Sequence, residues 1–100
     1  MFKIPKTVTI SGQTYKIIYK DEITLDDMEC DGLCCPGAKE VLINSQLDCE
    51  RTLQTFAHEL THVIVAETAI SRMLVMNNID EELFVEVFSK GVFDFLKGLK

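Results

Sequence analysis

The two histidines of the chain lie four residues apart, in the run His58-Glu59-Leu60-Thr61-His62. On an α-helix, four residues advance about 6 Å along the axis and return to nearly the same face. Two imidazoles placed in this way can bind one zinc ion, and the glutamate after the first histidine can act as a general base on a zinc-bound water. We therefore expect His58 and His62 to be zinc ligands and Glu59 to be the base. The alternative is a helix that presents two histidines and a solvated glutamate on its polar face.

A catalytic zinc site needs a third protein ligand and one open position. Because the chain has no other histidine, the candidates are carboxylates that follow in the sequence. Glu67 lies beyond the site on the same predicted helix, so we expect it at the surface. On the last predicted helix, we expect Glu82 to bind zinc and Glu86 to accept a hydrogen bond from a ligand histidine, with the reverse assignment also open. Glu81 can favour the positive end of the helix dipole, and all three acids can also form an acidic helix start without a metal.

The four cysteines lie between the predicted N-terminal strands and the first long helix, at Cys30, Cys34, Cys35 and Cys49. We expect them to be small, partly buried side chains. A structural zinc site is an alternative, although the spacing lacks the paired C-x2-C knuckles of common zinc modules. A disulfide is a third interpretation, which a reducing compartment disfavours.

The first half of the chain has the pattern of β-strands. Residues 7–10 and 14–20 predict a hairpin around a turn at 11–13, and residues 39–44 predict a third strand. Residues 21–31 are acidic and without periodicity, and residues 32–37 contain glycine and proline, so we expect loops there. The third strand is a candidate for pairing with an extended peptide through a free edge.

The second half predicts helices. Apolar residues recur at helical spacing over residues 49–67, with Ser45 or Asp48 as the cap. Asp80 caps the last helix, on which Val85, Phe88, Val92 and Phe95 fall on one face. Residues 69–76 can form a further short helix, and the apolar stretch 64–76 is expected in the core rather than on a partner surface. We predict one α+β domain over residues 1–100, in which a small antiparallel or mixed sheet of about three strands packs on two long helices.

Composition restricts the function classes. The chain has 100 residues, of which 47% are hydrophobic and 26% are charged, as in one globular domain. The net charge of −6 and the scattered basic residues disfavour nucleic-acid binding. No apolar stretch approaches the length of a membrane span, and the N-terminus lacks the apolar region of a signal peptide. We therefore expect a cytoplasmic protein that does not bind membranes.

The HExxH run together with Glu-x-x-x-Glu at residues 82–86 resembles the gluzincin arrangement, in which the first acid binds zinc and the second steadies a ligand histidine. The chain also resembles small phage-encoded and mobile-element metallopeptidase-like proteins allied to the ImmA/IrrE family. In those proteins a Gly-Cys-like turn and a strand precede the HExxH helix, as residues 31–35 and 41–43 do here. The resemblance implies a minimal zincin-like domain with Zn²⁺ as cofactor. It implies hydrolysis of peptide bonds in a peptide or protein substrate, with Glu59 as general base.

A second hypothesis is a catalytically silent zincin-like binding module. Small domains have little core and gain stability from a bound metal, so the zinc can be purely structural. A variant that replaces Glu59 with glutamine separates the two hypotheses, because only an enzyme loses turnover while keeping the metal.

Overall fold

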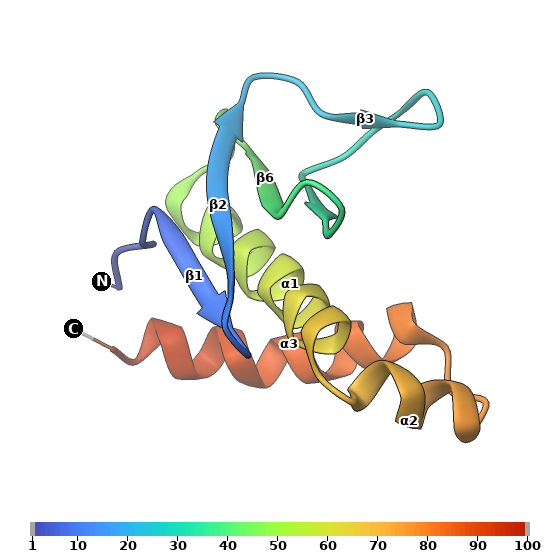
Figure 1. Cartoon of the computed structure of the whole chain (residues 1–100). Helices are drawn as coiled ribbons and strands as arrows, with labels where there is room; N and C mark the ends of the chain where they lie inside the picture. The colour runs from blue at the N-terminus through green and yellow to red at the C-terminus, as the bar shows by residue number, and fades with distance from the viewer. Residues whose placement is uncertain (1, 100) are drawn as a thin grey trace.

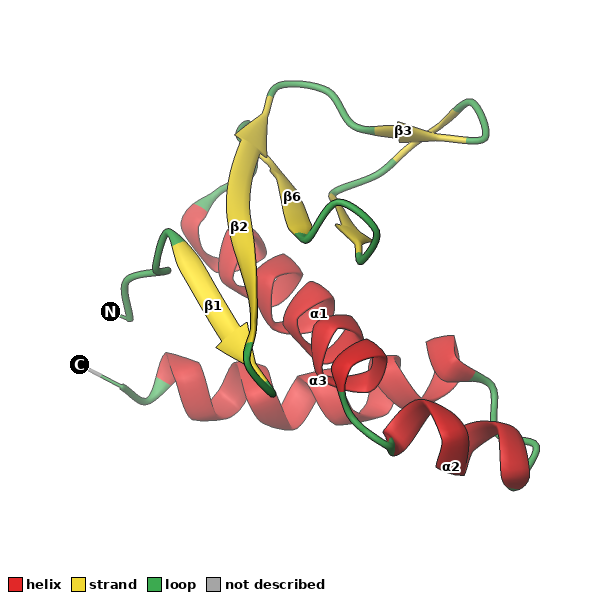
Figure 2. Ribbon diagram, viewed as in Figure 1, coloured by secondary structure: helices red, strands yellow, loops and turns green. Residues whose placement is uncertain are grey.

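The computed structural model of the protein describes residues 2–99 and has an α+β architecture (Figures 1 and 2). One mixed sheet has the strand order β1 (Thr7–Ile10), β2 (Gln13–Lys20), β6 (Glu40–Asn44) and β5 (Gly32–Cys35). A separate hairpin contains β3 (Thr24–Leu25) and β4 (Met28–Glu29). The helices are α1 (Cys49–Glu67), α2 (Ile70–Met76) and α3 (Glu81–Lys97). The predicted α+β class and the two long helices are confirmed, whereas the predicted number of strands was too low.

Strand β6 lies inside the mixed sheet. It pairs parallel to β2 and antiparallel to β5. The prediction that residues 39–44 offer a free edge was therefore wrong, since both edges of this strand are used. Among the described residues, β5 forms the edge of the sheet next to β6. Its residues had been predicted as loop because glycine and proline occur in this segment.

Strand β5 packs closely on α1 because of Gly32. A Cβ atom at this position would lie 2.5 Å from Cγ2 of Thr55 and 3.0 Å from the carbonyl oxygen of Leu42. Both distances are shorter than normal van der Waals contacts, so any side chain would push the strand away from the helix. The glycine therefore holds β5 beside the middle of α1, where the histidines lie.

The acidic segment that the sequence marked as loop contains the β3–β4 hairpin. Asp26 and Asp27 form its turn with φ angles of 52° and 63°. Two consecutive positive φ angles are typical of the type I′ turn, and aspartate tolerates them better than most residues. The hairpin was missed because its turn lacks the Asn-Gly or Asp-Gly pair that usually indicates this geometry.

Helix α1 is the central element and contacts both the sheet and α3. Its N-terminus is capped by Asp48, whose carboxylate accepts a hydrogen bond from the amide of Arg51 at 2.7 Å. Asp80 caps α3 in the same way through the amide of Leu83 at 3.0 Å, as predicted. The core consists of side chains from β2, β6, α1 and α3: Tyr15, Ile17, Val41, Ile43, Leu53, Phe56, Ala57, Val63 and Leu96.

Two expectations about buried helix faces were right only in part. In α2, Leu74 is buried but Met73, Val75 and Met76 are exposed, so much of this segment is surface. On α3, Val85 is buried and Val92 packs against the core as predicted, together with Ser89 and Leu96, whereas Phe88 and Phe95 point outward. The helix is apolar on two sides, and periodicity alone does not say which side packs.

Among residues 2–99, no helix combines the length and apolarity needed to cross a membrane.

Candidate metal centre

Helix α1 places both histidines on one side, facing the first turns of α3. The centroids of the His58 and His62 rings are 5.1 Å apart. Thr61, one of the residues between them, is buried, and its hydroxyl donates to the carbonyl of Ala57 at 2.8 Å. The predicted helical spacing therefore brings the two imidazoles together, beside a rigid part of the core.

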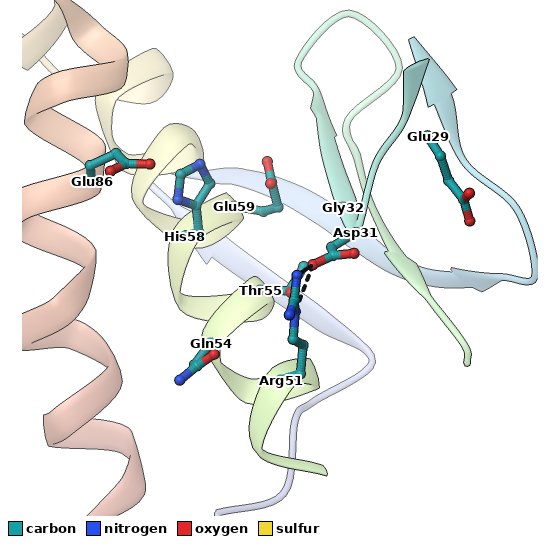
Figure 3. A pocket seen from close by; sticks show the side chains of 9 residues that line it. All are labelled: Glu29, Asp31, Gly32, Arg51, Gln54, Thr55, His58, Glu59 and Glu86. Atoms are coloured by element: carbon teal, nitrogen blue, oxygen red, sulfur yellow. Dashed lines mark hydrogen bonds and ion pairs between the residues drawn. The ribbon is translucent and has the colours of Figure 1, made fainter. Parts of the chain in front are cut away.

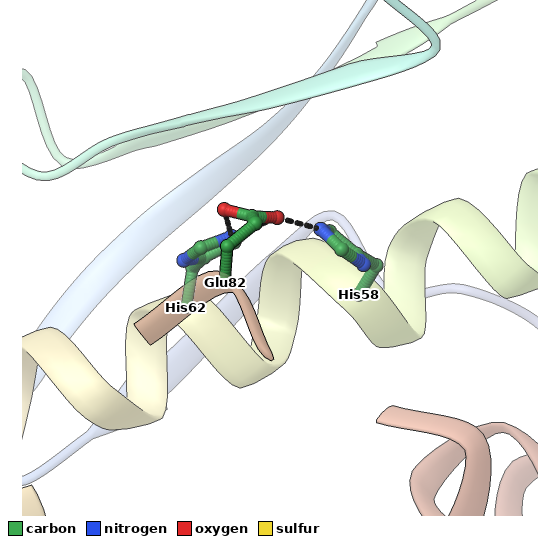
Figure 4. Close-up of side chains that lie close together, drawn as sticks. All are labelled: His58, His62 and Glu82. Carbon is green, nitrogen blue, oxygen red and sulfur yellow. Dashed lines mark hydrogen bonds and ion pairs between the residues drawn. The ribbon is translucent and has the colours of Figure 1, made fainter. Parts of the chain in front are cut away.

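Glu82 of α3 lies between the two rings, as Figure 4 shows. Its Oε1 atom is 2.9 Å from Nε2 of His58, and its Oε2 atom is 3.2 Å from Nε2 of His62. One atom from each of the three residues lies within 4.8 Å of the others, and no other such group of three is present within residues 2–99. The predicted third residue is therefore in place beside the histidines.

The donor set of this cluster is one that zinc accepts. A tetrahedral ion with bonds of about 2.0–2.1 Å holds its ligand atoms roughly 3.3–3.4 Å apart. The separations of 2.9 and 3.2 Å join the two histidines to different oxygens of Glu82 and have the length of hydrogen bonds, so the three side chains lie near one another at hydrogen-bonding distance. Two imidazole nitrogens and one carboxylate are also the donors found in many catalytic zinc sites.

Glu81 contacts one histidine of this cluster, a role that was predicted for Glu86. Its Oε2 atom is 2.7 Å from Nδ1 of His62, the ring nitrogen that does not face Glu82. A carboxylate at this position fixes the orientation of a metal-binding imidazole. Glu86, expected in such a role, lies in the structure on the wall of a cavity beside His58. Glu81 could not be recognised from its place at a helix start, where acids are common for other reasons.

The pKa values of these groups reflect their surroundings. Burial lowers the pKa of His62, but the hydrogen bond to Glu81 and the charges of Glu59 and Glu82 outweigh it, so the net shift is upward. For Glu59, burial raises the pKa, while the charges of His58 and His62 act in the opposite direction. The site thus holds an excess of acidic groups around two histidines.

Glu59 is only 7% exposed and lies where α1 meets β5. The backbone of Cys34 in β5 lies near the Glu59 carboxylate and acts to lower its pKa. A Cβ at Gly32 would lie 3.1 Å from Cγ of Glu59, so the glycine leaves the room that this side chain needs. Glu59 is therefore held beside the histidines and is not a solvated surface residue.

A cavity of about 580 Å³ adjoins His58 and Glu59, as Figure 3 shows. Arg51 and Asp31 form an ion pair of 2.6 Å in its wall and connect α1 to the start of β5. The remaining lining residues are mostly polar: Glu29, Gly32, Gln54, Thr55 and Glu86. A second cavity of about 300 Å³ lies on the other side of His58 and shares Gln54 and Glu86 with the first. The two cavities provide room for a ligand on both sides of His58.

Glu67 is not the surface residue that the sequence predicted. Its carboxylate accepts hydrogen bonds from the hydroxyl of Tyr15 at 2.5 Å and from Nζ of Lys39 at 2.6 Å, and its side chain is mostly buried. The hydrogen bond from Lys39 is the main cause of a lowered pKa for this carboxyl. Glu67 connects the end of α1 to the sheet region and is not a member of the cluster of His58, His62 and Glu82.

All four cysteines are free thiols, three of them half-buried. In the described part of the chain they form neither a disulfide nor a group of three metal ligands, so both alternative interpretations lack support. Cys34 packs against the core, and burial raises the pKa of its thiol to about 12. The cysteines are thus small, partly buried side chains or, for Cys49, an exposed one.

Comparisons of the chain with protein-family models, with curated proteins and with solved structures gave no significant match. The relation to zincins therefore stays a prediction.

Proposed function

We propose that the protein is a zinc-dependent metallopeptidase that hydrolyses peptide bonds in peptide or protein substrates. The observation that carries the proposal is the convergence of His58, His62 and Glu82 within 4.8 Å, with Glu59 buried beside them. Three protein ligands leave one position for water or a substrate oxygen, as catalytic zinc sites require.

In this proposal each residue has a distinct role. His58 and His62 bind zinc through Nε2, Glu82 binds it through its carboxylate, and Glu81 orients the ring of His62. When bound, zinc lowers the pKa of a coordinated water to about 7 and polarises a carbonyl group. Glu59 accepts the proton of the attacking water and later gives it to the leaving amine.

The carboxylate of Glu59 accepts a proton from the attacking water while the water oxygen forms a bond to the carbonyl carbon of the substrate. Glu59 then gives this proton to the amine nitrogen as the carbon–nitrogen bond breaks. Burial raises the pKa of Glu59, which makes it a stronger base than a solvated glutamate.

An extended peptide can bind along β5. This strand has an unpaired outer edge among the described residues, and it lies next to Glu59. Main-chain hydrogen bonds to such an edge hold a peptide without selecting its sequence. The cavities on both sides of His58 would then receive substrate side chains.

A structural role for zinc is the second candidate. The cluster joins the first turns of α3 to the middle of α1, as a metal that stabilises a small fold would do. In that case the protein would be a binding module of the zincin type, without turnover.

The test combines zinc analysis with cleavage of a peptide library, followed by mass spectrometry. We expect the wild type to bind stoichiometric zinc and to cleave peptides, and Glu59→Gln to keep the zinc and the fold but to lose cleavage. Glu22→Gln, at an exposed position outside the site, is the matched control and should behave as wild type. A wild type that binds no zinc contradicts the proposal. A wild type that unfolds on zinc removal but cleaves no peptide identifies the binding module.

A further inference from the structure

The outer side of α3 is apolar although it faces away from the core. Leu83, Val87 and Phe95 are 62%, 66% and 67% exposed, and Phe88 is 49% exposed. The opposite side of the same helix packs inward through Val85, Ser89 and Leu96. In Figure 1 the helix runs along the lower edge of the molecule, with the sheet above it. An exposed apolar strip of this length is typical of an interaction surface.

This outer side has both a ridge and a groove. The groove, of about 490 Å³, lies over Gly91 and is bordered by Val87, Phe88, Val92 and Phe95. A Cβ at Gly91 would meet no atom within 4 Å, so the space above the helix is open there. Next to it, the rings of Phe84 and Phe88 stack with their centroids 5.3 Å apart. A surface with a ridge beside a groove can fit a copy of itself.

We propose that two copies of the chain associate through this side of α3, with the helices antiparallel about a two-fold axis. If Phe88 of each copy lies opposite Phe95 of the other, Gly91 of both copies falls at the crossing point. The missing side chain then allows the two helices to approach closely. Each groove receives aromatic side chains of the second copy.

The charges beside the strip favour a second copy over another partner. Lys90 and Asp94 lie one helical turn apart on the same flank, and neither forms an ion pair with another residue in the range 2–99. In the antiparallel arrangement, Lys90 of each copy lies near Asp94 of the other. The same pair of opposite charges therefore occurs on both sides of the two-fold axis.

The available area suits a reversible dimer. Aromatic side chains bury about 150–250 Å² each and the aliphatic ones somewhat less, so with the exposed fractions above the four side chains supply about 450 Å² per copy. A dimer would thus bury about 900 Å² of this strip in total, which is the size of a weak, transient interface. We expect dissociation in the high-micromolar concentration range, since so small an area leaves little surplus over the cost of association.

Sedimentation equilibrium of the full chain tests the inference, with circular dichroism to confirm that each variant is folded. We expect the wild type to change from monomer to dimer over high-micromolar concentrations. Phe95→Glu and Val87→Glu should each raise the dissociation constant at least about tenfold. Val75→Glu is the matched control, because Val75 is 77% exposed on α2, outside the strip, and this variant should dimerise as wild type does.

A charge exchange tests the arrangement of the two helices. Lys90→Glu and Asp94→Lys should each weaken the dimer, because like charges then face each other across the axis. The double variant should regain most of the loss, since the opposite charges meet again in exchanged positions. A wild type that stays monomeric to millimolar concentration overturns the proposal and leaves the strip to a partner of different sequence. Equal weakening by Val75→Glu, or a double variant weaker than both single ones, also overturns it.

Discussion

Gly32→Ala tests how closely β5 packs on the helix that carries the histidines. The added methyl group would lie 2.5 Å from Cγ2 of Thr55, 3.0 Å from the carbonyl oxygen of Leu42 and 3.1 Å from Cγ of Glu59. Because one of these neighbours is backbone, the strand itself has to move. Overpacking of this kind costs about 1–3 kcal/mol in the free energy of unfolding. For a domain of this size, that corresponds to a melting temperature lower by roughly 4–20 °C.

The control is Gly37→Ala, because a Cβ at Gly37 meets nothing within 4 Å. We expect this variant to stay within about 0.5 kcal/mol of wild type. Thr55→Ser removes the methyl group that lies closest to the new Cβ, so the double variant with Gly32→Ala should be more stable than the sum of the single effects by about 1 kcal/mol. Urea unfolding measures all four proteins. A Gly32→Ala protein as stable as wild type, or strictly additive effects, would refute the proposed close contact.

Three further predictions concern the proposed zinc site and the C-terminal end of α1. Glu81→Ala should weaken zinc binding by about 10–100-fold, because Nδ1 of His62 loses its hydrogen-bond partner, and competition with a chromophoric chelator measures the affinity. Glu86→Ala is the control and should change the zinc affinity much less. Equal losses in the two variants would contradict the role assigned to Glu81. A chelator should lower the melting temperature of the zinc-loaded wild type but not that of His58→Ala, and an unchanged wild-type melting curve would argue against a bound metal. The pKa of Glu67 is lowered in the folded protein, so its contribution to stability is present at neutral pH and is lost as the pH falls through the carboxyl range. Thermal melts should therefore show a smaller loss of stability on acidification for Glu67→Gln than for wild type, and parallel curves would contradict this.

The sequence predicted the parts of the fold that depend on local patterns. Helices α1 and α3 follow from apolar spacing, and their first residues follow from the side chains of Asp48 and Asp80, which act as caps. Strand β5 and the turn at Asp26 and Asp27 were missed. Strand β5 is stabilised by pairing with β6 and packing on α1, which a local pattern does not show. The turn has the uncommon pair Asp26 and Asp27 at its positive φ angles.

Residues that act through contacts between distant segments were predicted less well. The pair His58 and His62 is local, because both ligands lie on one helix. The choice between Glu81 and Glu86 as the partner of a histidine depends on where α3 crosses α1, and one sequence pattern does not contain that information. The partners of Glu67 were missed for the same reason, since Tyr15 comes from β2 and Lys39 from the turn before β6.

The charges around the histidines explain why a cation suits this contact between α1 and α3. Glu59, Glu81 and Glu82 bring three carboxyl groups to two imidazoles, in a region that is partly shielded from water. The upward pKa shift of His62, which the hydrogen bond to Glu81 and the charges of Glu59 and Glu82 produce against burial, indicates that its surroundings favour an additional positive charge, whereas the upward shift of Glu59 is due mainly to burial. Protons can supply that charge one group at a time, whereas a divalent ion supplies it at the point where the three ligand atoms converge. Zinc binding should therefore stabilise the same helix contact that Val85 and Ser89 make by packing, so that the metal and the core position Glu82 together.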